Sequence, residues 1–155
     1  MSLRLYIDRL EQFSDRCGAP VIRNSLIAGV FGRTERGCIV LRAGLSLDQQ
    51  VLTLVHELTH LIVHCNASPR INRTVCEYEA EAVESWVGTE LAVEPHADET
   101  LNVSSVTDDL LACSVARVRW AAGTLLGVAQ SKSCPALSPS ATTDAVRRRD
   151  LDSVR

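Results

Sequence analysis

The sequence contains few aromatic residues and almost no lysine. Among 155 residues there are two Trp, two Tyr and two Phe, and Lys132 is the single lysine among 16 basic residues. The net charge is −3 and the basic residues form no stripe, so the composition gives no support to direct nucleic-acid binding. No apolar run reaches the roughly 18–20 residues of a membrane-spanning helix, which argues against a membrane protein.

The sequence also lacks an export signal and paired cysteine motifs. The N-terminal segment has no apolar region followed by a small-residue cleavage site, so we expect a cytoplasmic protein. The six cysteines are widely spaced and form no CxxC pair. In a chain without a signal peptide, this spacing favours free thiols over a disulfide framework.

Hydrophobic periodicity indicates one α+β domain. The 46% hydrophobic content is sufficient for a core. The pattern predicts a helix at 3–16, a hairpin with strands 25–31 and 38–42 around a turn at 32–37, and helices at 47–64, 72–93 and 108–127. This order predicts a small antiparallel sheet with three to four helices. We expect residues 1–130 to form the domain and the Ser-, Pro- and Arg-rich residues 131–155 to be a disordered tail.

The central predicted helix contains the motif HExxH, formed by His56, Glu57 and His60. Residues four apart lie on one face of a helix, so both imidazoles can reach one zinc ion. Glu57 is then placed to accept a proton from a water molecule at the metal without being a ligand. The surrounding apolar residues indicate a buried helix, where His and Glu without partners are costly. The motif therefore predicts a Zn²⁺ site.

The third ligand must come from another element. His64 continues the spacing, but two turns from His56 correspond to about 12 Å, which is too far for one ion. We expect His64 to pack against or support a ligand.

The next helix offers four glutamates, of which Glu79 alone points towards the apolar face. The other three glutamates cluster on the opposite side of the helix, which we expect to be solvated. They are Glu77, Glu81 and Glu84. A buried carboxylate requires a partner, and a metal held by two histidines would supply one. The sequence therefore favours Glu79 as the third ligand. The alternative is that Glu79 pairs with a buried arginine.

Two histidines and one glutamate leave a fourth position open, as in catalytic zinc sites. Such a site suits hydrolysis of a peptide bond, with Glu57 as the general base. Tyr78 and His96 are candidates for stabilising the oxyanion of the transition state. The sequence thus predicts a zinc-dependent metallo-endopeptidase.

The segments "TLVHELTHLIVH" and "EYEAEAVESWV" resemble the ImmA/IrrE-like metallopeptidases. The residues of these two segments most resemble those of the metallopeptidase domain of ArdC-like antirestriction proteins. The resemblance covers roughly residues 25–127. It implies a compact zincin-like, gluzincin-type fold with the HExxH helix at its centre. It also implies ligands at His56, His60 and Glu79.

The same resemblance implies that the strand formed by Cys38, Ile39, Val40 and Leu41 lines the cleft and pairs with an extended substrate. The implied partner is a protein or peptide substrate, with a transcriptional regulator as a candidate. The alternative function is a weakly catalytic or non-catalytic zinc-binding antirestriction or regulatory partner. An intact Glu57 favours the enzyme, because a structural zinc site needs no base.

Overall fold

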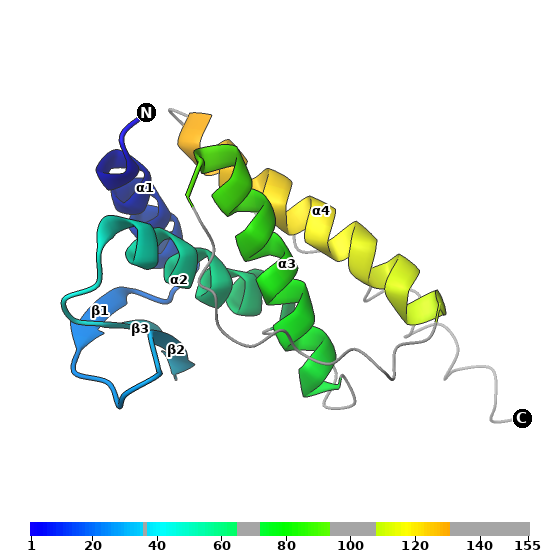
Figure 1. The fold of residues 1–155 in the computed structure, drawn as a ribbon, viewed down its shortest axis with the longest axis horizontal. Helices are drawn as coiled ribbons and strands as arrows, with labels where there is room; N and C mark the ends of the chain where they lie inside the picture. Colours follow the sequence, from blue (N-terminus) through cyan, green and yellow to red (C-terminus); the bar gives the residue numbers. More distant parts are fainter. Residues whose placement is uncertain (36, 65–71, 94–107, 131–155) are drawn as a thin grey trace, which may run out of the picture.

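The computed structural model describes residues 1–35, 37–64, 72–93 and 108–130, and this part contains four α-helices and three strands (Figure 1). In chain order the elements are α1 (Leu3–Arg16), β1 (Val21–Asn24), β2 (Gly32–Glu35), β3 (Cys38–Arg42), α2 (Leu47–Thr59), the π-helical turn η1 (His60–His64), α3 (Arg73–Leu91) and α4 (Asp108–Gln130). The predicted α+β class is confirmed. The predicted tail lies outside the described residues.

The sheet differs from the predicted antiparallel hairpin in two respects. Its strand order is β1-β3-β2, in which β1 runs parallel and β2 antiparallel to β3. The strand predicted at 25–31 is wrong, because β2 begins only at Gly32, inside the predicted turn. Glu35 pairs with Cys38, and Gly37 adopts the positive φ of 76° that tight turns between paired strands require.

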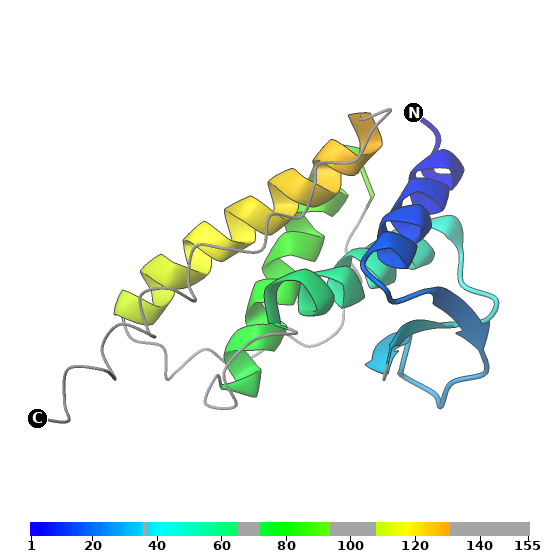
Figure 2. The same cartoon turned by 180° about the vertical axis from the view of Figure 1, so that it is seen from behind.

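Helix α2 lies between the sheet and the helix pair α3 and α4 (Figures 1 and 2). It contacts β2 and β3 on one side and α3 on the other, and α1 packs against its N-terminal part. The core is built from apolar side chains of all four helices and β3, the largest of which include Tyr6, Phe13, Ile39, Leu54 and Leu125. Because α2 is surrounded in this way, its polar residues are held between packed layers.

The N-terminal end of α2 follows from local sequence. Ser46 caps the N-terminus in a capping box, in which its hydroxyl accepts from the Gln49 amide and the Gln49 side chain accepts from the Ser46 amide. The predicted start at residue 47 is therefore confirmed. At the other end the α-helix stops at Thr59 and continues as the π-turn η1, which contacts both α3 and α4. π-turns are rare and occur frequently at functional sites.

Candidate metal centre

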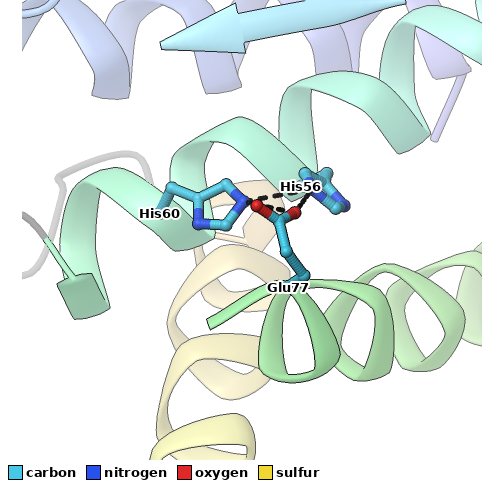
Figure 3. A group of neighbouring side chains, drawn as sticks. All are labelled: His56, His60 and Glu77. Atoms are coloured by element: carbon cyan, nitrogen blue, oxygen red, sulfur yellow. Dashed lines mark hydrogen bonds and ion pairs between the residues drawn. The ribbon is translucent and has the colours of Figure 1, made fainter. Parts of the chain in front are cut away.

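Helices α2 and α3 bring two imidazoles and one carboxylate together (Figure 3). His56 and His60 lie one turn apart on and directly after α2, and Glu77 approaches them from the first part of α3. The two Nε2 atoms are 3.1 Å apart, and each is 3.4 Å from Oε2 of Glu77. Among the described residues, these three side chains form a group that can hold a metal ion.

The spacing of the three donor atoms fits a zinc ion. Donors bound to zinc at roughly 2.0–2.1 Å in a tetrahedral arrangement lie about 3.3–3.4 Å from one another. The observed separations of 3.1, 3.4 and 3.4 Å match this value closely. A set of two imidazole nitrogens and one carboxylate oxygen is also a donor set that zinc accepts, with one position left open.

A second carboxylate orients His56. Its Nδ1 lies 3.1 Å from Oε2 of Glu84, and an ionised carboxylate can only accept, so Nδ1 carries the proton. Nε2 is then the nitrogen that faces His60 and Glu77. Burial opposes the charged form of His56, but the carboxylates of Glu77 and Glu84 outweigh it and raise the pKa of His56 to about 10. This site therefore attracts a cation strongly, whether a proton or a metal.

Glu57 lies beside this group and is held by the neighbouring strand. Its Oε2 accepts a hydrogen bond of 2.8 Å from the Thr34 hydroxyl on β2, and its side chain is almost entirely buried. The approach of β2 to α2 depends on Gly32, where a Cβ atom would lie 2.4 Å from Cγ2 of Thr53 and 3.2 Å from Cγ of Glu57. The strand thus fixes the carboxylate next to the metal group.

Glu79 is buried, as its position on the helix predicts, but it lies among other partners. Its carboxylate accepts from Nε of Arg117 at 3.0 and 2.9 Å, from a second guanidinium nitrogen, and from the Ser114 hydroxyl at 2.5 Å. Its Oε2 is also 2.9 Å from Nε2 of His64. Burial opposes ionisation of Glu79, but these bonds outweigh it and lower its pKa to about 2.

The structure therefore does not place Glu79 with His56 and His60, and the carboxylate that it brings to them belongs to Glu77. The physical reason is that the interior beside Glu79 contains a guanidinium from α4, which neutralises the buried charge. This is the arrangement that the sequence left open as the alternative. His64, expected to support a ligand, contacts both Glu79 and His60.

The face of α3 expected to be solvated is instead half-buried and lines a cleft. Glu77, Glu81 and Glu84 all belong to the cleft wall. They recur at spacings of four and three residues, so they share one face of the helix. A pairing of α2 with α3, considered on the sequence alone, would have placed this row of carboxylates opposite the two histidines. That signal could have been found without the structure.

The cleft has a volume of about 1150 Å³ and runs between the segment before β2, β2 itself, α2 and α3. His56, Glu57, His60 and Glu77 all lie on its wall. Pockets of about 300–1,000 Å³ hold typical small ligands, so this cleft is large enough for a segment of peptide.

The sequence also predicted a substrate-pairing strand and two residues that stabilise the transition state. Residues Ile39 to Leu41 pair with β1 on one side and β2 on the other, so the strand Cys38–Leu41 cannot accept a substrate strand. The strand beside the cleft is β2, which within the described residues pairs only with β3.

Tyr78 is half-buried on α3 and is not among the described residues that line the cleft, and His96 lies outside the described residues. Their role in stabilising a transition state stays a prediction.

Comparison with protein families gives a match over the middle of the chain. The model of the peptidase M78 family, described as the IrrE N-terminal-like domain, matches residues 20–94. This range contains the sheet, α2 and α3, and therefore the whole candidate metal centre. The chain is thus similar to a family of peptidases, in agreement with the resemblance to ImmA/IrrE-like proteins.

No curated protein and no solved structure matches the chain. The described helices include none that is both long enough and apolar enough to cross a membrane.

Proposed function

We propose that the protein is a zinc-dependent metallo-endopeptidase in which His56, His60 and Glu77 hold the ion. The observation that carries this proposal is the convergence of two imidazole nitrogens and a carboxylate oxygen at 3.1–3.4 Å on the wall of a cleft. Such a group of electron pairs requires a cation between them. The match to a peptidase family over the same residues supports peptide hydrolysis as the reaction.

The protein's own contribution to the reaction centres on Glu57. Bound in this site, zinc would lower the pKa of a water molecule and polarise the peptide carbonyl. Glu57 accepts the proton from the attacking water and later donates it to the nitrogen of the leaving amine. The Thr34 hydroxyl holds one carboxylate oxygen at 2.8 Å, which leaves the other oxygen for proton transfer. Glu84 keeps the proton of His56 on Nδ1 and so keeps Nε2 available as a ligand.

The substrate is proposed to be a segment of a protein bound in extended form along β2. An edge strand offers backbone groups for the addition of another strand. This assigns to Gly32–Glu35 the pairing that the sequence assigned to Cys38–Leu41. A regulatory protein is the first candidate, because the resemblance to ImmA/IrrE-like and ArdC-like proteins implies it.

The test is hydrolysis of a library of random-sequence peptides by zinc-loaded protein, followed by mass spectrometry. Wild-type protein is expected to generate new termini, and Glu57→Gln is expected to retain zinc and lose roughly 10²–10⁴-fold in rate, because only proton transfer is removed. The matched control is Glu90→Gln, an exposed position of α3, which should leave the rate unchanged. Equal cleavage by wild type and Glu57→Gln would contradict the mechanism. Zinc binding without any cleavage would favour the non-catalytic alternative.

A further inference from the structure

A chain of buried polar side chains links α4 to the metal group. Arg117 and Ser114 on α4 bind the carboxylate of Glu79. Oε2 of Glu79 is 2.9 Å from Nε2 of His64, and Nδ1 of His64 is 3.2 Å from Nδ1 of His60. These contacts place Glu79 two hydrogen bonds away from a proposed zinc ligand.

The donor in each of these hydrogen bonds follows from the two ends of the chain of contacts, which are the carboxylate of Glu79 and the metal-binding nitrogen of His60. Glu79 is ionised and can only accept, so Nε2 of His64 carries a proton and donates it. A metal on Nε2 of His60 would leave the proton of that imidazole on Nδ1, which lies 3.2 Å from Nδ1 of His64. That Nδ1–H then donates to Nδ1 of His64, which accepts with its lone pair. Nε2 of His60 is left with a lone pair, directed at Nε2 of His56 and at Glu77.

The π-turn η1 and the packing around it make this arrangement possible. A π-turn changes the direction in which later side chains leave the helix, and His64 is the last residue of η1. The side chains of His64 and Glu79 are only 9% and 1% exposed, so water competes little for their hydrogen bonds. Weak competition from water makes hydrogen bonds of this kind stronger and more directional.

We propose that His64 and Glu79 are positioning residues that hold His60 in the one tautomer able to bind a metal through Nε2. This inference rests on the proposed function, because it concerns the same metal site. It gives Glu79 a different part from that of a ligand: its charge fixes the proton of His64, which fixes the proton of His60. His56 receives the equivalent support directly from Glu84, on the cleft side.

Nitrogen NMR of histidine-labelled protein tests the proton positions directly. In both metal-free and ¹¹³Cd-loaded protein, we expect a proton on Nδ1 of His60 and a scalar coupling across the hydrogen bond between the two Nδ1 nitrogens of His60 and His64. Cadmium should couple to Nε2 of His56 and His60, and to neither nitrogen of His64. A coupling to His64, or a proton on Nε2 of metal-free His60, would overturn the inference. Cadmium that couples to no histidine would instead overturn the proposed metal site.

Two substitutions test the consequence for binding. His64→Leu removes the acceptor and should weaken zinc binding by about 10- to 100-fold, the usual effect of losing a partner of a ligand. His64→Asn places an amide oxygen near the position of Nδ1 and should restore most of that loss. Equal affinities of wild type and both variants would contradict the role of His64, as would an Asn variant as weak as the Leu variant. If His64→Leu does not fold, the Asn variant and the NMR couplings of the wild type decide the question.

Discussion

Gly32→Ala is expected to disturb the packing of β2 on α2 and therefore the setting of Glu57. A Cβ atom at this position would lie 2.4 Å from Cγ2 of Thr53 and 3.2 Å from Cγ of Glu57. Carbon atoms in ordinary contact are about 3.5–4.0 Å apart, so the strand and the helix must separate by on the order of 1 Å. Thr53 is nearly buried and branched at Cβ, so its side chain has little freedom to move away.

Overpacking of this kind costs about 1–3 kcal/mol of the free energy of unfolding, which urea denaturation measures. A shift of roughly 1 Å beside the reacting atoms also lowers the rate of hydrolysis, by up to about 10²-fold. Thr53→Ser removes the methyl group closest to the new side chain. The double variant Gly32→Ala, Thr53→Ser should therefore recover stability, with a coupling energy above about 0.5 kcal/mol.

Gly123→Ala is the matched control, since Gly123 lies in α4 and no atom comes within 4 Å of its Cβ position. This change should be neutral or should stabilise the helix by up to about 1 kcal/mol. The explanation fails if the free energy of unfolding of Gly32→Ala lies within about 0.5 kcal/mol of the wild-type value. It also fails if Thr53→Ser does not reduce the effect.

Three further predictions concern the metal group and the end of the domain. Because the pKa of His56 is raised in the folded state, its protonation stabilises the metal-free protein, and this stabilisation is fully present below a pH of roughly 6.5. The free energy of unfolding of the metal-free protein should therefore fall as the pH rises towards about 10. The fall should be smaller in His56→Gln. Glu77→Gln should weaken zinc binding more than Glu79→Gln, and Glu90→Gln should leave it unchanged; the reverse order of the first two would restore Glu79 as the ligand. Removal of the residues from Ser131 onwards should leave the melting temperature and zinc content intact, and aggregation of the shortened chain would count against a domain that ends at residue 130.

The sequence alone was sufficient where local chemistry determines the structure. Ser46 and Gln49 form the predicted capping box, and the HExxH spacing places both imidazoles on one side of the helix. The mixed sheet was not predictable, because a four-residue strand carries no signal of which neighbour it pairs with or in which direction.

The carboxylate of the metal group shows the limit of a single helix pattern. The pattern correctly places Glu79 in the interior, but it does not reveal what else is buried there. Arg117 comes 38 residues later, and its approach depends on how α4 packs against α3. A buried carboxylate is satisfied equally well by a guanidinium or a metal, so only the packing of three helices distinguishes the two.

The zinc content of protein purified without chelator tests the central claim most directly. Elemental analysis should find one zinc ion per chain in the wild type, and little or none in His56→Ala and His60→Ala, since each variant removes one of the three ligands. Because zinc binds the folded chain, its removal by EDTA should also lower the melting temperature. Wild-type protein without stoichiometric zinc, which also fails to bind added zinc, would contradict the assignment of His56, His60 and Glu77 as a metal centre.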